Sequence, residues 1–387
     1  MPSHSPVRRR FTVVTTALVS LAAADFWVRG KSEALNPFYV DNYQRKTKAL
    51  DQLVEAPRIL ILGSSRAAYA LVPEEFERIT GAAAFNLGIP ASKVVEWQIL
   101  VERTLARVRP DLVVLGVNAA ELRADYLPVS AARDLFGFSD LIDYLAKDGW
   151  SFEVASHFLE RRGGAAWPLF HRRFELLSWL HENAMTGAFP KHAQIARERR
   201  NVASRTCPPD GYEHPWLNND RMRTLETQMR DDASLIVTAG TPEFDPDAPA
   251  MRRFGELLDG FGARSVPVIV AYLPNSPRTE SRWSGGEGEI ERAISQCCAE
   301  RNIAYIGAGI TELPRSNADY FEETHMGLQL AQRISRRAAE CAVARGLIGL
   351  PETHFATSPE PVGKPSAGGV RVSLSAESDG DGDTQPP

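Results

Sequence analysis

Polar residues follow three apolar, strand-like runs of the sequence, and a fourth polar block precedes a long helical pattern. Gly63-Ser64-Ser65 follows "ILIL", Gly88 follows "FNL", Gly116-Val117-Asn118 follows "LVVL", and "EETH" ends at His325. Serine attacks an acyl carbon when a base takes its proton, and the base needs a carboxylate to orient it. Backbone and amide N–H groups stabilise the resulting oxyanion. These residue types predict acyl transfer through a serine.

Each of these residues also has a purely structural interpretation. A serine after a strand commonly caps the next helix, and Asn118 can cap the segment that follows it. Gly88 can serve as a turn glycine. His325 stands near a predicted helix start, where histidines are often structural. The catalytic interpretation explains all four residues with one mechanism.

The elements that must position these residues alternate along the chain. Strand-like runs occur at 58–62, 84–87, 111–115, 266–273 and 303–306. Helical patterns occur at 45–54, 74–80, 93–107, 251–263, 288–301 and 327–345. Such alternation predicts an α/β fold, a five-stranded parallel sheet covered by helices on both faces. Ligands bind at the carboxyl edge of such a sheet, where the polar blocks would meet.

Residues 126–250 interrupt this alternation and divide the chain. We interpret 31–125 and 251–350 as two parts of one α/β domain, and 126–250 as a mainly helical insertion or lid. Residues 351–387 are rich in Pro, Gly, Ser and Asp and predict a disordered tail. Aromatic residues of the insertion are candidates for stacking on sugar rings. They include Trp150, Trp167, Trp179 and Trp216.

Residues 1–30 predict an export signal. Arg8-Arg9-Arg10 precede residues 11–24, which carry no charge. This segment is either a signal peptide cleaved after Ala24, giving a secreted protein, or an uncleaved anchor with Phe26 and Trp27 at the membrane interface. We favour the anchor. Both interpretations place the remaining chain outside the cytoplasm, in the periplasm or on the outer face of the cytoplasmic membrane.

Composition excludes some partners and leaves others open. The chain has 387 residues and a net charge of −5, and its Lys and Arg residues are scattered, which argues against nucleic-acid binding. Its four cysteines, at 207, 297, 298 and 341, allow three pairings in an oxidising compartment or remain free thiols. Their spacing is not a metal signature, and we expect neither a metal nor a cofactor.

The polar blocks, in this order, resemble those of the SGNH (GDSL-type) hydrolase and acyltransferase superfamily. The resemblance covers residues 59 to about 345 and implies a three-layer, flavodoxin-like α/β/α fold. It implies Ser65 as nucleophile and His325 as base. The oxyanion donors would be the backbone N–H groups of Ser65 and Gly88 and the side-chain amide of Asn118.

The chain departs from the family pattern at two positions. Ser64 stands where the family motif has Asp, which resembles the "GSS" variants of membrane-associated branches. Glu322 stands where the family usually has the Asp that orients the base. We expect Glu322 to orient His325, with Asp319 as the alternative acid.

The resemblance also suggests what the reaction serves. Membrane-tethered branches of the superfamily modify envelope or exported polymers, commonly by moving acetyl groups onto sugar hydroxyls. We therefore expect a serine esterase or O-acyltransferase that forms an acyl-Ser65 intermediate. Its partners would be a carbohydrate acceptor and an acyl donor, supplied in such branches by a membrane-embedded acyltransferase. The alternative is a non-catalytic envelope scaffold or carbohydrate-binding protein that retains the fold.

Overall fold

The computed structural model describes residues 16, 19–24, 26, 38–90, 92–122, 127–128, 131–132, 135–166, 207–212, 245–282, 286–320 and 325–349. Three groups of expectations fall largely or wholly outside these residues: the anchor or signal segment, most of the insertion with Trp167, Trp179 and Trp216, and the tail. No helix in the described part of the chain combines the length and apolar character needed to cross a membrane.

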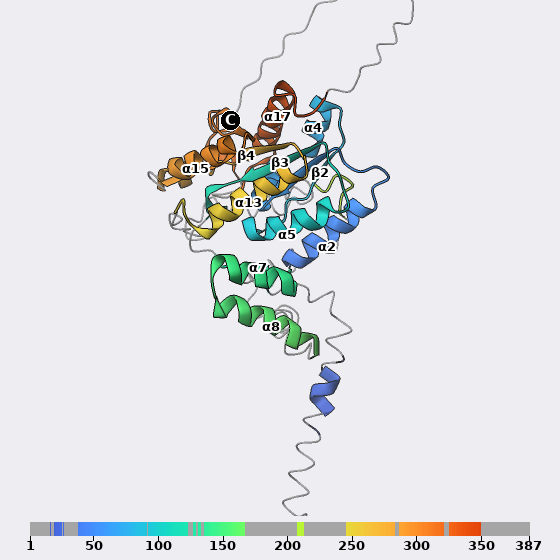
Figure 1. Cartoon of the computed structure of the whole chain (residues 1–387). Coiled ribbons are helices and arrows are strands. Elements are labelled where there is room, and N and C mark those ends of the chain that lie inside the picture. The colour runs from blue at the N-terminus through green and yellow to red at the C-terminus, as the bar shows by residue number, and fades with distance from the viewer. Residues whose placement is uncertain are drawn as a thin grey trace, which may run out of the picture. The chain divides into compact units, whose positions relative to one another are not determined.

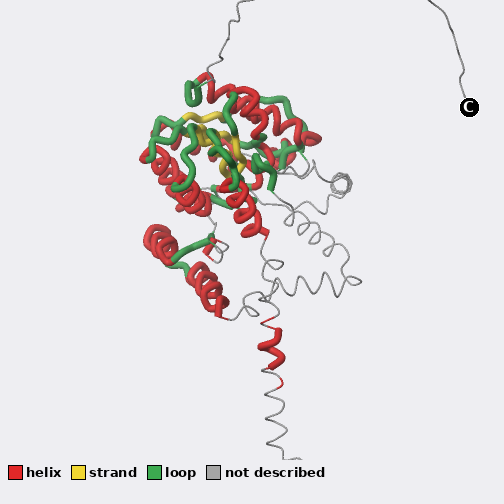
Figure 2. Tube along the Cα trace, turned by 90° about the vertical axis from the view of Figure 1, so that its right-hand side faces the viewer, coloured by secondary structure: helices red, strands yellow, loops and turns green. Residues whose placement is uncertain are grey.

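A five-stranded parallel sheet forms the centre of the domain, as the alternation predicted (Figure 2). Its strands are β1 (Ile59–Gly63), β2 (Ala84–Asn86), β3 (Leu112–Val117), β4 (Val268–Tyr272) and β5 (Ala304–Ile306). They lie in the order β2-β1-β3-β4-β5. This order is that of doubly wound, flavodoxin-like sheets, and it reverses direction beside β1. The end of β1 therefore lies where such sheets bind their ligands.

Helices connect and cover the strands (Figure 1). They are α2 (Phe38–Asp51), α3 (Ser65–Ala70), α4 (Pro73–Thr80), α5 (Val94–Leu105), α7 (Phe138–Asp148), α8 (Phe152–Ala166), α13 (Pro249–Ala263), α14 (Pro277–Arg282), α15 (Gly286–Glu300), α16 (Ala308–Thr311) and α17 (Leu328–Ala344). Two short 3-10 helices, η2 (Ala119–Glu121) and η4 (Asn317–Asp319), complete the described elements. Helix α2 begins seven residues before the predicted 45–54 segment.

The side chains of each strand alternate between two apolar cores. Leu60 and Leu62 pack in the core beneath α5, α13 and α15, whereas Ile59 and Ile61 pack in the core beneath α3, α4 and α17. Every residue of β1 is buried. Burial of one such aliphatic side chain is worth about 1.5–3 kcal/mol, so both faces of the strand resist displacement. The ends of β1 are therefore fixed points of the fold.

The first part of the insertion packs on the α5 and α13 side of the domain. Arg253 on α13 pairs with Asp148, the last residue of α7, at 2.7 Å, and with Asp143 at 3.0 Å. Burial would raise the pKa of Asp143, but hydrogen bonds to Lys147 and Arg253 outweigh it and hold the pKa below its ordinary value. A buried Arg253–Asp148 pair, extended by the partly exposed Asp143, thus attaches α7 to the sheet domain.

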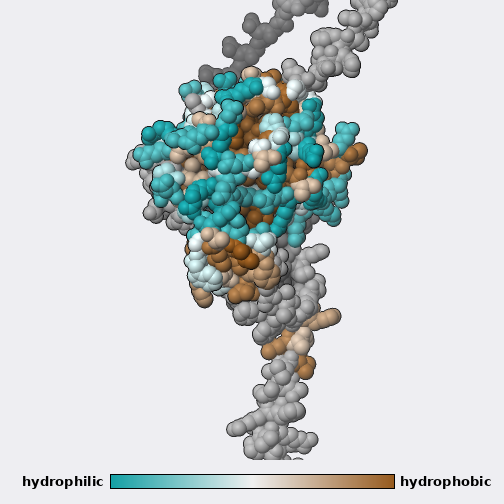
Figure 3. Space-filling view, viewed as in Figure 1, coloured by the Kyte–Doolittle hydropathy of each residue, from teal (hydrophilic) through white to brown (hydrophobic). Residues whose placement is uncertain are grey.

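Helices α7 and α8 and the connection between them carry exposed apolar side chains (Figure 3). They are Phe138, Ile142, Trp150, Phe152 and Leu159. Trp150, the one candidate sugar-stacking tryptophan in the described residues, is 76% exposed. It is therefore accessible, as stacking would require.

All four cysteines lie in the described residues, and each is a free thiol in this structure. Cys297 and Cys298 are buried against the core under α15. Burial raises the pKa of Cys298 to about 12, which keeps its sulfur protonated at neutral pH.

Replacing Gly63 by Ala tests the packing at the end of β1. Gly63 has φ 136°, and a Cβ there would lie 2.5 Å from the backbone oxygen of Gly116. Backbone strain and this collision should together cost about 3 kcal/mol or more of unfolding free energy, measurable by urea denaturation.

Gly262→Ala is the matched control for this substitution. Gly262 lies exposed near the end of α13, and a Cβ there would meet nothing within 4 Å. The free energy of unfolding of this variant should equal that of the wild type or exceed it by up to about 1 kcal/mol, so its urea midpoint should be equal or slightly higher. Equal midpoints for the Gly63 variant and the wild type would contradict the packing described here.

Candidate active site

Ser65 lies at the point where β1 passes into α3. The strand ends at Gly63, Ser64 occupies the N-cap with φ −83° and ψ −161°, and Ser65 is the first helical residue. The Ser64 side chain accepts a hydrogen bond from the Arg66 N–H at 3.1 Å. Serine hydroxyls at the N-cap commonly satisfy a free N–H of the first helical turn in this way. Ser64 is 4% exposed, whereas Ser65 is only partly buried. The two adjacent hydroxyls therefore face different surroundings.

His325 reaches Ser65 from the opposite end of the domain's sequence. Its Nε2 lies 2.7 Å from Ser65 Oγ, although 260 residues separate the two. This separation is within the range in which an imidazole takes a proton from a hydroxyl. The His325 ring also meets the ring of Tyr69 edge to face, with centroids 5.1 Å apart. Tyr69 lies one turn after Ser65 on α3, so one helix contacts the histidine twice.

The backbone just after His325 is fixed by contacts to residues 319 and 320. Tyr320 and Met326 form an antiparallel bridge, and both side chains are 2% exposed. The Gly327 N–H donates to the Asp319 carbonyl at 2.7 Å. These contacts hold Met326 and Gly327 against Asp319 and Tyr320 just before α17 begins at Leu328. The residue after His325 is therefore fixed in place.

Of the two acids proposed to orient His325, the structure describes only Asp319. Glu322 lies outside the described residues. The Asp319 carboxylate accepts from the N–H of Ser316 at 2.7 Å and from its hydroxyl at 3.0 Å, and pairs with Arg333 at 3.1 Å. The contacts described for Asp319 thus serve the cap of η4 and the start of α17.

The proposed oxyanion donors also make contacts within the protein. The Gly88 N–H donates to Asn86 Oδ1 at 2.8 Å, so this single donor is already used. Asn118 is fully buried, and its Nδ2 donates to the Leu273 carbonyl at 2.5 Å. An amide nitrogen carries two N–H groups, and this contact accounts for one of them. The structure thus brings Ser65 and His325 together, and it gives Gly88 and Asn118 additional structural roles.

A buried amide fastens the other end of α3. Asn86, at the end of β2, donates through Nδ2 to the carbonyls of Ala67 at 3.1 Å and Leu71 at 2.6 Å. The hydroxyl of Ser335 on α17 accepts from the Val72 N–H at 2.7 Å and donates to the Ala70 carbonyl at 3.1 Å. The last carbonyls of a helix need such partners when buried. Helix α3 is therefore held at both ends.

Part of the insertion reaches the edge of the site. In the segment 207–212, the Asp210 carbonyl accepts from the Asn86 N–H at 2.7 Å, and the Tyr212 hydroxyl donates to the Tyr69 carbonyl at 3.0 Å. Burial raises the pKa of Tyr212, and the nearby Asp210 carboxylate adds to this effect, so the hydroxyl remains a donor. The insertion therefore supports the residue that contacts His325.

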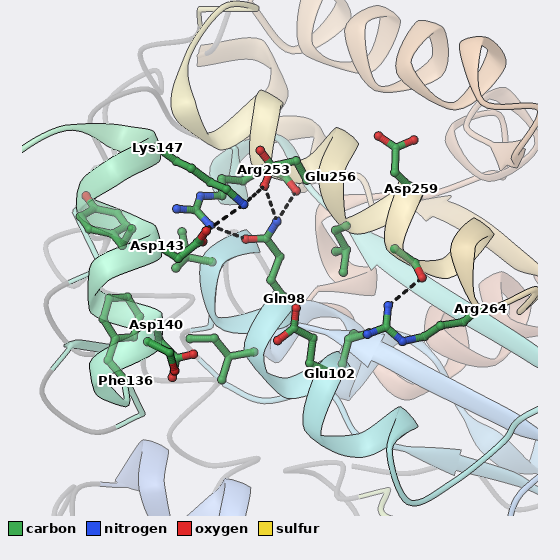
Figure 4. A pocket seen from close by; sticks show the side chains of 17 residues that line it. Gln98, Glu102, Phe136, Asp140, Asp143, Lys147, Arg253, Glu256, Asp259 and Arg264 are labelled. Carbon is green, nitrogen blue, oxygen red and sulfur yellow. Dashed lines mark hydrogen bonds and ion pairs between the residues drawn. The ribbon is translucent and has the colours of Figure 1, made fainter.

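A cavity of about 490 Å³ lies elsewhere, between α5, α7 and α13 (Figure 4). Ser65, Tyr69 and His325 do not line it. Its charged side chains pair with one another, as Lys147 does with Glu256 at 3.1 Å and Arg253 does with Asp143 at 3.0 Å. We interpret this cavity as part of the interface between α7 and the sheet domain, separate from the site around Ser65. Within the described ranges, no cluster of three or more His, Cys, Asp or Glu side chains could hold a metal ion.

Sequence reasoning missed Tyr69, Tyr212 and Glu121. Glu121 follows Asn118 by three residues, and this spacing is the signature of a capping box that could have revealed it. No sequence pattern links Tyr212 to Tyr69, because 143 positions separate the two residues in the chain.

No model of a protein family matches the chain. A search of curated proteins likewise gives no significant match.

Asn86→Asp tests the fastening of α3. The substitution replaces an amide donor with a carboxylate that faces the carbonyls of Ala67 and Leu71. We expect a loss of about 3 kcal/mol or more in unfolding free energy at pH 7.

The loss from Asn86→Asp should depend on pH in a defined direction. Burial beside carbonyls would raise the pKa of the new carboxyl above its unfolded value of about 3.9. The variant should therefore be closest to wild type below about pH 4 and weaken as pH rises through its folded pKa. Asn302→Asp, at an exposed turn, is the control and should change little. A pH-independent difference would contradict the arrangement.

Proposed function

We propose that the protein is a serine esterase or O-acyltransferase of the SGNH type that forms an acyl-Ser65 intermediate. The observation that carries this proposal is the 2.7 Å separation of Ser65 Oγ and His325 Nε2. The pair lies at the carboxyl edge of a parallel sheet, beside the reversal of strand order. The order of the four polar blocks supports the SGNH assignment.

The reaction would use these residues in two steps. His325 takes the Ser65 proton as Oγ attacks the acyl carbonyl, and the protonated imidazole then gives that proton to the leaving oxygen. The Ser65 N–H and one N–H of Asn118 are the proposed donors to the oxyanion. Water or a sugar hydroxyl then transfers its proton to His325 as it attacks the acyl-serine, and His325 returns that proton to Ser65 Oγ as the bond between Oγ and the acyl carbon breaks. Glu322 is the proposed orienting acid.

The proposed setting is the cell envelope. A basic N-terminus followed by an apolar segment favours a membrane-anchored, extracytoplasmic enzyme, and the family resemblance favours acetyl groups and carbohydrate acceptors. Trp150 is exposed, so its indole face is accessible to a sugar ring. An acyl donor would come from a membrane-embedded partner.

One observation favours the non-catalytic alternative. The Gly88 N–H is bonded to Asn86 Oδ1, so a backbone donor expected for the oxyanion is engaged by the protein itself. An envelope scaffold or carbohydrate-binding protein would need no such donor. The two functions differ in whether Ser65 reacts.

Labelling with a fluorophosphonate tests the proposal directly. We expect the full-length protein, in mild detergent, to gain the mass of one phosphonyl group at Ser65. Ser65→Ala should abolish the adduct, and His325→Ala should slow its formation by about 100-fold or more, because the hydroxyl loses its base. Tyr305→Phe, which removes a hydroxyl on β5, is a control that should label normally. A folded wild-type protein that does not label would favour the scaffold.

The pH profile tests the role assigned to His325. A histidine base must be neutral to accept the serine proton, and a protonated imidazole cannot take it. Hydrolysis of p-nitrophenyl acetate should therefore fall toward acidic pH. A flat profile between about pH 5 and 8 would contradict a histidine base.

A further inference from the structure

A closed ring of buried polar groups lies behind Ser65. Glu121 Oε1 accepts from the Ser64 hydroxyl, and Glu121 Oε2 accepts from the Asn118 N–H at 2.7 Å. Ser64 Oγ accepts from the Arg66 N–H at 3.1 Å, and the Arg66 guanidinium donates to Asn118 Oδ1. The ring joins the residue before the proposed nucleophile to the residue after β3.

All four members of the ring are buried. Ser64, Arg66, Asn118 and Glu121 are 4%, 9%, 0% and 1% exposed, respectively. A buried carboxylate is costly unless hydrogen bonds and a nearby opposite charge compensate it, and Arg66 supplies that charge through Asn118. An ordinary capping glutamate would meet only the N–H of its own turn. Glu121 instead uses its second oxygen on a residue 57 positions earlier in the chain.

The geometry points to Glu121 as a positioning residue for the reaction, an inference that rests on the proposed function. Through Ser64 it fixes the cap from which α3 leaves β1, and hence the direction of Ser65 Oγ toward His325. The amide of Asn118 is oriented in the same ring, because Oδ1 accepts from Arg66 and from the Ala120 N–H at 3.0 Å. Its Nδ2 is thereby turned away from Arg66. One carboxylate thus sets both the nucleophile and a proposed oxyanion donor.

Glu121→Gln is the sharpest test of this role. An amide keeps the shape of the carboxylate but removes its charge and accepts with only one of its two terminal atoms, so the Ser64 hydroxyl must either lose its bond or reverse it and accept from the amide nitrogen. We expect kcat for p-nitrophenyl acetate and the fluorophosphonate labelling rate to fall by about 10- to 100-fold. The KM should stay within about twofold, since the change affects the transition state more than ester binding.

Asp148→Asn is the matched control. Asp148 is also a buried carboxylate paired with an arginine, with its side chain 3% exposed, but it belongs to the α7 attachment on Arg253. This variant should lower the melting temperature without changing kcat per folded molecule. A Glu121 variant that behaves the same way, less stable but with normal kcat and labelling, would overturn the inference.

Ser64→Ala provides a second route to the same answer. It removes the other end of the Glu121 bond, and alone it should lower kcat by about 10-fold or more. In the double variant with Glu121→Gln the losses should be far from additive, because both changes break one unit. Fully additive losses would overturn the inference. If Glu121→Gln does not fold, a normal kcat for Ser64→Ala would overturn it, and a reduced kcat with unchanged KM would support it.

The outcome for the wild type separates the two proposals. If the wild-type protein labels and the Glu121→Gln and Ser64→Ala variants label equally fast, the proposed function stands but Glu121 has no positioning role. A folded wild-type protein that does not label removes the proposed function, and the positioning role with it.

Discussion

The close approach of α3 to the ends of three strands is the constraint on which the site depends. A Cβ on Gly63 would lie 2.6 Å from the Cβ of Ala67, and one on Gly116 would lie 2.8 Å from the same atom. A Cβ on Gly88 would lie 2.6 Å from the backbone nitrogen of Ala68. Each of these three strands therefore has a glycine at or near its end, because α3 occupies the space that a side chain would fill. Only with α3 seated at this depth can its first residue meet His325.

This constraint changes the meaning of the glycines in the polar blocks. From sequence, Gly88 was interpreted as a source of a backbone donor, yet its N–H is bonded to Asn86 and its lack of a side chain is what α3 requires. Similarly, the two hydroxyls after β1 divide two tasks. The Ser64 hydroxyl accepts from the Arg66 N–H as the helix cap and donates to Glu121. Ser65 is therefore the hydroxyl that faces the histidine. A strand can end on two serines because one of them completes the helix start.

The sheet was predictable from sequence because its signal is local and repeated. Aliphatic runs bounded by turn residues gave the five strands, and alternation with helices gave their parallel direction. That topology placed Ser65 at the carboxyl edge of the sheet, whereas the expectation that His325 would meet it came from the order of the polar blocks. The partners of Arg66, Glu121 and Tyr212 did not follow. Their contacts depend on side-chain directions between segments far apart in the chain, for which no periodic pattern exists.

The described parts of the insertion attach to the domain at two separate places. Helix α7 is joined to α13 through Arg253 and its two aspartates, whereas the segment 207–212 lies along the end of β2 and bonds to Tyr69. The second attachment also supplies the Asp210 carbonyl to the N–H of Asn86, the residue that fastens α3. Removing the insertion would therefore expose buried backbone groups beside the candidate site. The segment 207–212 is thus part of the structure that supports Tyr69 beside His325, and the effect of the insertion on substrate choice must be tested by point substitutions rather than by deletion.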